Sequence, residues 1–358
     1  MMASIKSAFV ILWILLLSSA CESTHNSRVD YGLSVTGKVG EILVVCEQGI
    51  WNSEIKNHLD TGLTQWILPY FPDVATFSLV HKTPSHFTQG VKRYRNTMFI
   101  DIDPDYTGEY GSIVKREDVW AKGQLVIEVT GKDFNQVLET CRLGMGEVHD
   151  LFDEIEWRRL IKKFSRNKNT GVRDAIKTNF GIDLTLPSNS KLVSKRKNFY
   201  RVEFPPGSRP IEFVGTGTQD VGSILSGILI YQYDYKDSSQ FELKQLLQAR
   251  DTMLKYNVPH EIEGMYMGTQ YNPVVYPEGN IMQSSDGKIK GYEMRGMFLF
   301  TGLPKHSTGG AFWAFHFLNT KTQKLVCISG YVDAPPTTSW THPLREIQAI
   351  LRSVSDVK

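Results

Sequence analysis

The sequence of 358 residues predicts an α+β protein whose two halves are built differently. In the first half, apolar runs typical of strands alternate with amphipathic helical stripes, which indicates an α/β layer. In the second half, long strand-like segments follow one another and few helical stretches interrupt them. Hydrophobic residues make up 41% of the chain and charged residues 22%, a balance typical of packed globular proteins.

The first 20 residues have the order of a secretory signal peptide. Lys6 supplies a positive charge, Ser7–Leu17 is an apolar run, and Ser18–Ala20 are small. A membrane-spanning helix needs about 20 apolar residues, and this run is much shorter. We therefore predict a signal peptide over residues 1–20.

Cys21 directly follows the small residues, and two cleavages fit this segment. An ordinary signal peptidase would release a soluble chain, whereas a lipoprotein peptidase would cut before Cys21 and leave a lipid on its sulfur. The segment resembles a bacterial lipobox, although Ser18 stands where leucine is usual. The polar, aperiodic residues that follow are typical of a flexible tether. We predict lipid attachment at Cys21, through acyl chains such as palmitate, and a tether over residues 21–38.

Residues 39–180 are expected to form an N-terminal α/β domain with a mixed sheet and a long helix. Apolar side chains at steps of three or four predict a helix between Trp51 and Trp66, and a long one from Phe134 to Phe164. Gly144 and Gly146 are expected to bend or interrupt the long helix. The predicted strands are Gly40–Cys46, Ala75–Lys82, Asn96–Asp103 and Gln124–Gly131.

Residues 181–358 are expected to form a C-terminal domain with an antiparallel sheet, one central helix and a C-terminal helix. Five strand-like segments lie here, and a polar turn at Asn319–Gln323 predicts a hairpin between the last two. Ser239 and Glu242 have capping-box spacing and predict the start of the central helix. Thr341 is the predicted cap of the last helix.

The charge and the cysteines exclude some functions. Lys and Arg number 40 against 38 acids, so no overall field attracts nucleic acid, and no nucleic-acid partner is expected. Cys46, Cys141 and Cys327 have apolar neighbours and fit no metal-binding spacing. We interpret them as buried side chains, with one disulfide as the alternative.

No catalytic, cofactor-binding or metal-binding residue is predicted. The motifs G-x-S-x-G and H-E-x-x-H are absent, and no S-x-x-K is of the penicillin-binding kind. Asp101–Glu109 has the acidic spacing of a calcium loop, but Tyr106 replaces the required glycine. Phe213–Ser223 is glycine-rich, but its glycines do not have dinucleotide-loop spacing. His316 lies among aromatic residues, where a packed histidine is commoner than a base.

Two further groups of residues each have two interpretations. His81 and His86 flank a turn and would serve as metal ligands only if the fold added a carboxylate. A basic run follows Glu156 and is either a solvated helix end or a patch for anionic lipid headgroups. Its members are Arg158, Arg159, Lys162, Lys163, Arg166 and Lys168.

Motifs spread over the chain carry a family resemblance. They include "GKVGEILVV", "VWAKGQLVIEVTG", "FGIDLTLP", "GILIYQYDY", "RDTMLKYNVP" and "REIQAILRSV". Together they resemble a Bacteroidota envelope lipoprotein family known as a domain of unknown function, over nearly the whole mature chain. The second half also resembles the PsbP/Mog1-like architecture. The resemblance implies a location in the cell envelope and a fold, but it implies no activity.

We therefore expect a lipid-anchored cell-envelope protein, held in the outer membrane through a lipid on Cys21. Because no catalytic motif is present, a binding or interaction module is the favoured function, with an envelope protein or a glycan as partner. No cofactor is expected. The alternative is an envelope hydrolase whose active-site residues are dispersed along the sequence.

The lipid prediction is tested by the intact mass of the mature protein from membranes. We expect the wild type to begin at Cys21 with a lipid-sized mass increment, because the thiol there is the acceptor. Cys21→Ser should lose both the increment and membrane association. An unmodified wild-type chain in the soluble fraction would contradict the prediction.

Overall fold

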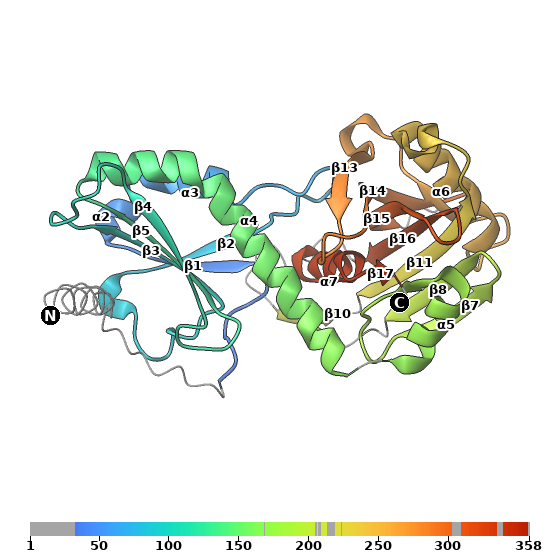
Figure 1. Cartoon of the computed structure of the whole chain (residues 1–358), viewed down its shortest axis with the longest axis horizontal. Coiled ribbons are helices and arrows are strands. Elements are labelled where there is room, and N and C mark those ends of the chain that lie inside the picture. The colour runs from blue at the N-terminus through green and yellow to red at the C-terminus, as the bar shows by residue number, and fades with distance from the viewer. Residues whose placement is uncertain are drawn as a thin grey trace, which may run out of the picture.

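The computed structural model describes residues 33–356, apart from 168, 205, 207, 208, 213–218, 223, 303–308 and 335–338. The predicted signal peptide, Cys21 and most of the predicted tether lie outside the described residues. The fold is α+β, as predicted, with two lobes that share one long helix, α4 (Figure 1). None of the described helices combines the length and apolar character needed to cross a membrane.

The N-terminal lobe contains a five-stranded mixed sheet in the order β2-β1-β3-β5-β4. Strands β1, β2, β3 and β5 are parallel, and β4 is an antiparallel edge strand. The polar edge strand β4 was not predicted, because most of its side chains are exposed and give no apolar pattern. The bounds are β1 Glu41–Val45, β2 Ser78–Lys82, β3 Asn96–Ile102, β4 Ser112–Glu117 and β5 Leu125–Gly131.

Helices α2 (Gln48–Trp51), α3 (Glu54–Leu63) and the first part of α4 (Phe134–Arg166) pack with this sheet around one core. The predicted interruption of α4 is wrong, because the helix runs unbroken through Gly144 and Gly146. A Cβ atom on Gly144 would lie 2.3 Å from Ile113 Cδ1. Gly144 therefore lets α4 pack closely on β4 instead of ending the helix.

Helix α5 (Thr170–Phe180) follows α4 and ends at Gly181, which has a left-handed φ of 67°. Its buried side chains Val172, Ile176 and Phe180 belong to the core of the second lobe. The short strand β6 (Ile182–Asp183) then pairs with β17 (Ser355–Asp356) near the end of the described chain.

The second lobe contains an eight-stranded antiparallel sheet, as predicted. Its order is β12-β14-β15-β16-β11-β8-β7, and β13 pairs with β14. Strands β9 (Arg209–Glu212) and β10 (Gln219–Gly222) form a separate pair. The predicted hairpin is β15–β16. The bounds are β7 Lys191–Arg196, β8 Phe199–Phe204, β11 Leu225–Asp234, β12 Tyr266–Thr269, β13 Glu278–Gln283, β14 Lys290–Thr301, β15 Gly309–Asn319 and β16 Lys324–Asp333.

Helices cover both faces of this sheet, so its long strands are buried on both sides. In β11, Leu229 and Tyr231 face α6 (Leu243–Asn257). Their neighbours Ile228 and Ile230 join the opposite core with α5, the end of α4 and α7 (Thr341–Arg352). This alternation is the two-residue period of a strand.

The predicted caps of these helices differ from the observed ones. The capping box is formed by Asp237 and Gln240 on the 3-10 helix η2 (Ser238–Phe241), which precedes α6. Glu242 is the N-cap residue of α6 and makes no side-chain cap bond. Trp340, not Thr341, is the N-cap of α7. Two further 3-10 turns are η1 (Pro84–His86) and η3 (Pro273–Val275).

Arg345 of α7 joins the two lobes. Its side chain is 2% exposed and donates a hydrogen bond to Asp153 of α4 and another, of 2.9 Å, to the carbonyl oxygen of Thr76. Its guanidinium lies 4.6 Å from the ring centre of Phe77 in the N-terminal lobe. Gln348 also donates to Asp153, at 2.9 Å. A buried cation is thus held between three elements of the chain.

We expect Asp153→Ala to lower the free energy of unfolding by about 3 kcal/mol, because it leaves the buried Arg345 without its carboxylate. Urea denaturation measures this change. Glu147→Ala, an exposed acid on the same helix, is the control and should change stability by less than about 0.5 kcal/mol. Equal effects of the two substitutions would contradict the prediction.

Candidate functional site

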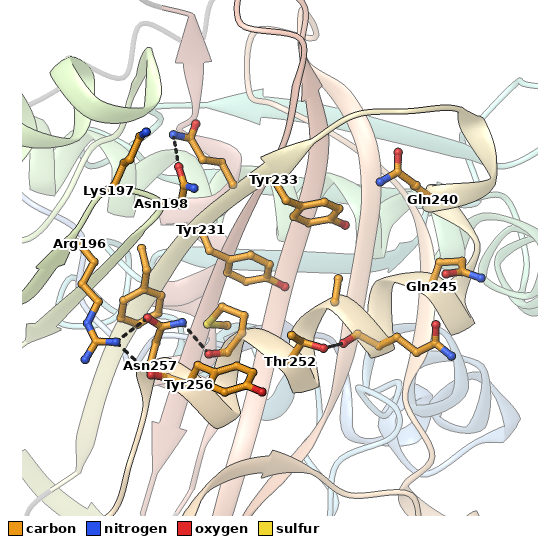
Figure 2. A pocket seen from close by; sticks show the side chains of 15 residues that line it. Arg196, Lys197, Asn198, Tyr231, Tyr233, Gln240, Gln245, Thr252, Tyr256 and Asn257 are labelled. Carbon is orange, nitrogen blue, oxygen red and sulfur yellow. Dashed lines mark hydrogen bonds between the residues drawn. The ribbon is translucent and has the colours of Figure 1, made fainter.

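The candidate site is a cavity of about 600 Å³ between α6 and the strands β8 and β11 of the second lobe. A volume of this size fits a small organic ligand. Helix α6 supplies one wall, β11 supplies the other, and the turn between β7 and β8 closes one end (Figure 2). The lining residues are Arg196, Lys197, Asn198, Phe199, Tyr231, Gln232, Tyr233, Gln240, Gln245, Gln248, Ala249, Thr252, Met253, Tyr256 and Asn257.

Tyrosines form the inner wall of the cavity. Tyr231 and Tyr233 are two residues apart on β11, so both face α6, and their rings are stacked with centroids 6.4 Å apart. Tyr256 faces them from the end of α6 (Figure 2). The hydroxyl of Tyr233 is buried and has no hydrogen-bond partner among the described residues. The wall therefore presents aromatic faces to the cavity, while the Tyr233 hydroxyl is enclosed by protein.

Amides and cations form most of the polar part of the lining. Gln240 and Gln245 lie at the end of the cavity away from the β7–β8 turn (Figure 2). Six of the lining residues are Asn or Gln, and none is Asp, Glu or His. An amide group both donates and accepts hydrogen bonds, whereas a carboxylate only accepts. The cavity is therefore suited to a ligand with many hydroxyl groups.

Arg196 fixes the end of the cavity at the β7–β8 turn. Its Nη1 donates to the carbonyl oxygen of Tyr256 at 3.0 Å and to Oδ1 of Asn257 at 3.1 Å. These contacts lie at the C-terminal end of α6, where a positive charge is favourable. Asn257 in turn donates to the carbonyl oxygen of Met253 at 2.9 Å. The strand and the helix are thus held together next to the opening.

A buried arginine holds α6 on the sheet behind the cavity. Arg250 is fully buried, and its guanidinium lies 3.6 Å from the ring centre of Phe312. It donates to Oγ1 of Thr269 at 3.2 Å and to Oγ of Ser329 at 2.6 Å. Burial lowers the pKa of Arg250. Because α6 carries this residue, its position against β12 and β16 is defined.

His316, the histidine predicted to be packed, is fully buried on β15. Its Nε2 lies 3.3 Å from the hydroxyl oxygen of Tyr231, behind the cavity wall. Burial, together with the nearby positive charge of Arg250, lowers its pKa to about 3. His316 is therefore neutral at pH 7, and it lies behind Tyr231 instead of lining the cavity.

The other histidines and the cysteines of the sequence analysis lie elsewhere. His81 donates to the carbonyl oxygen of Cys46 at 3.0 Å and stacks on Trp51, while His86 pairs with Thr83. Cys46, Cys141 and Cys327 are free and buried, and burial raises the pKa of each thiol to about 12. Each therefore stays a protonated thiol at neutral pH, and no disulfide joins them.

The acidic and glycine-rich segments give no site. Asp103 accepts a hydrogen bond from the backbone of Asp105 at 3.0 Å and forms a turn at the end of β3. The described residues contain no group of three or more His, Cys, Asp or Glu that could hold a metal ion. In the segment Phe213–Ser223, residues 213–218 and 223 lie outside the described residues, and Gln219–Gly222 is strand β10.

A second cavity, of about 550 Å³, is lined by strands of the second lobe and by the segment 259–261 that follows α6, and it contains groups that a hydrolase would use. His260, Ser226 and Asp333 are among its lining residues. Nδ1 of His260 accepts a hydrogen bond from the backbone of Ile262 at 3.0 Å, and its ring packs on Phe300. No hydrogen bond joins His260 to a serine or a carboxylate among the described residues. The cavity therefore shows no assembled nucleophile and base.

The first cavity was not predicted from the sequence. Its residues come from a turn, three strands and two helices, and no short motif spans them. The available signal was the pair Tyr231 and Tyr233 on one face of a strand, followed by the glutamine-rich segment 240–248.

The architecture defines an α+β protein with two sequence units. Residues 35–165 match the family described as Domain of unknown function (DUF8532). Residues 169–353 match the family described as Domain of unknown function (DUF4837), and the chain belongs to this family. The prediction of domains of unknown function over most of the chain is confirmed, with two family models in place of one.

Solved structures with some likeness to this chain include two of Mog1. The Ran-binding protein Mog1p of Saccharomyces cerevisiae is 14% identical, with a TM-score of 0.30 over 50% of this chain and 91% of that chain. A point mutant of the protein Mog1 is 13% identical, with a TM-score of 0.29 over 50% of this chain and 92% of that chain. A search of curated proteins finds no match.

We expect His316 to make the protein less stable in acid. Its folded pKa of about 3 lies below the ordinary value of 6.5, so the unfolded chain binds more protons below pH 6.5. This contribution to stability is complete above pH 6.5 and falls as the pH decreases toward 3. Between pH 6 and pH 4.5 it should fall by about 2 kcal/mol.

Urea denaturation of wild type and His316→Gln at both pH values measures this effect. The variant lacks the titrating ring, so its loss of stability over the interval should be about 2 kcal/mol smaller. Parallel stability curves for the two proteins would show that His316 does not titrate as described.

Proposed function

We propose that this protein is a lipid-anchored binding protein of the bacterial cell envelope, and that the cavity between α6 and β11 binds a glycan. The anchor would be a lipid on Cys21, and the membrane would be the outer membrane. The proposal assigns retention of a ligand, not its chemical conversion, to the second lobe.

The lining of the cavity carries the glycan part of the proposal. Each sugar hydroxyl donates and accepts, and the side-chain amides of Gln245 and Gln248, which make no hydrogen bond within the described part of the chain, can do both. Sugar rings also have apolar faces, and the rings of Tyr231, Tyr233 and Tyr256 offer matching surfaces.

The absence of acids from the lining favours binding over glycoside cleavage. Glycosidases of the usual kind place two carboxyl groups on either side of the scissile bond. The 15 lining residues include no Asp or Glu, whereas Arg196 and Lys197 supply positive charge. The cavity would therefore accept a neutral or an acidic sugar.

Support for the anchor comes from the sequence on both sides of Cys21. Ser34 and Thr36 pair with Lys122 and Tyr94 at the edge of the first lobe. Residues 22–32, ahead of this point, have a tether composition. A lipid on Cys21 would leave both lobes outside the bilayer, where a glycan can reach the cavity.

We expect the detergent-purified full-length protein to bind members of a bacterial glycan array. Tyr256→Ala combined with Gln245→Ala should weaken this binding by about tenfold or more, because one aromatic surface and one amide are lost. Both side chains are exposed, so the fold should tolerate the changes.

Tyr110→Ala combined with Gln48→Ala is the matched control. Both residues are exposed in the N-terminal lobe, and their loss should leave glycan binding unchanged. The proposal fails if no glycan binds, or if both double variants bind as tightly as the wild type.

A further inference from the structure

A third cavity, of about 690 Å³, lies where the first described residues pass the C-terminal half of α4. Residues from the loop before β5 and from α7 complete its wall. Six of its lining side chains are Arg or Lys, one is His, and none is acidic. The six cations are Arg95, Lys122, Arg159, Lys162, Lys163 and Arg166. This cavity therefore carries a concentrated positive charge in a nearly neutral protein.

The base of the cavity is a rigid network of buried groups. The carboxylate of Glu156 is fully buried, and its Oε1 lies 3.2 Å from Arg95 Nε and 3.1 Å from Arg159 Nη1. Arg159 also donates to Asn96 Oδ1 at 2.8 Å and to the carbonyl oxygen of Arg95 at 2.6 Å. Asn96 donates to Glu156 at 2.7 Å.

This network pairs two positive charges with one buried negative charge, and the acids Asp118 and Glu117 lie near Arg159. Two guanidinium groups share one carboxylate, and Nε of Arg95 is buried without a hydrogen bond. Burial lowers the pKa of Arg159 to about 10, which shows how poorly its charge is solvated. An anion in the cavity would offset this cost.

The mouth of the cavity adds exposed cations. Lys122, Lys162 and Arg166 are exposed and form no ion pair within the described part of the chain. Lys162 and Arg166 are four residues apart on α4, a spacing at which like charges repel on a helix. The C-terminal end of a helix favours positive charge. This effect does not by itself explain why three cations without ion-pair partners among the described residues surround one cavity.

The start of the described chain places this cavity near the predicted lipid. Leu33, Ser34 and Val35 line it, and the backbone of Lys122 donates to the carbonyl oxygen of Leu33 at 3.2 Å. Cys21 is twelve residues earlier in the sequence. Twelve residues span at most about 40 Å when fully extended, and about 20 Å as a flexible coil. A lipid on Cys21 would keep the cavity close to the membrane surface.

We propose that this cavity binds the phosphate groups of an anionic ligand, and that the tether makes a lipid headgroup the source. The exposed cations would contact the phosphate oxygens, while Arg95 and Arg159 would supply fixed positive charge at the base. The volume exceeds that of a single ion and fits a headgroup with one or two phosphates. This site is separate from the proposed glycan cavity. The proposed anchor enters only as the reason why a lipid, and not a soluble molecule, would supply the phosphate groups.

The test uses the full chain with Cys21→Ser, so that no lipid of its own holds the protein on membranes. Binding is measured by flotation with vesicles of phosphatidylglycerol and phosphatidylcholine, and by calorimetry with inorganic pyrophosphate. The test variant combines Lys122→Gln, Lys162→Gln and Arg166→Gln. The control variant has the same loss of charge on exposed lysines of the second lobe and combines Lys236→Gln, Lys244→Gln and Lys255→Gln.

We expect the Cys21→Ser chain to bind anionic vesicles, with binding that weakens as salt is raised from 50 to 200 mM. The test variant should bind at least about tenfold more weakly, and the control variant should bind within about twofold of the parent. Pyrophosphate binding that is lost in the test variant, without vesicle binding, would support the phosphate site and assign it a soluble source.

Two results would overturn the proposal. One is no binding of either probe by the parent chain. The other is an equal loss in the test and control variants, which would show that net charge acts without a site. Because the glycan array uses a different cavity and different variants, either proposal can fail while the other stands.

Discussion

Helix α4 has to bury two separate apolar stripes, and the arrangement of both lobes depends on this constraint. Its first turns place Val137, Cys141 and Met145 in the core of the N-terminal lobe. Its last turns place Trp157, Leu160 and Phe164 in the core of the second lobe. A helix of 33 residues is about 50 Å long, so it reaches both cores without a break. Each lobe therefore stabilises the helix that the other lobe needs.

Between the two stripes, α4 carries the half-buried Asp153 and the fully buried Glu156, both enclosed by the lobes that it joins. Asp153 accepts hydrogen bonds from Arg345 and Gln348 of α7, and Glu156 is enclosed by Arg95 and Arg159. Buried ion pairs add little net stability, but they are costly to separate. They thus define how α7 and β3 meet the helix, and they place the basic cavity on one side of the junction.

The proposed glycan and phosphate sites have opposite chemistry and lie on different elements. The glycan cavity in the second lobe is formed by amides and tyrosines, and its two cations lie at one end. The phosphate cavity lies beside the start of the described chain and is formed mainly by cations. An anchored protein with both would hold one surface near phosphate groups of the membrane and present the other cavity to glycans.

The sequence by itself determined the element types, because side-chain periodicity depends only on the local chain. The apolar run of β1 and the stripes of α3 and α7 were readable for this reason. Predictions from the sequence failed where contacts with another element determine the local structure. Gly144 continues a helix because Ile113 packs against it, and the polar edge strand β4 forms because β5 supplies its hydrogen bonds.

Only the tertiary structure decided the sites. Tyr231, Gln245 and Tyr256 become neighbours through the packing of α6 on β11, which Arg250 holds in place. The basic run of α4 was visible in the sequence. The sequence did not show that this run lies next to Arg95, Lys122 and the first described residues. Periodicity records which face of an element is buried, whereas a cavity depends on which faces meet, and that is determined by long-range packing.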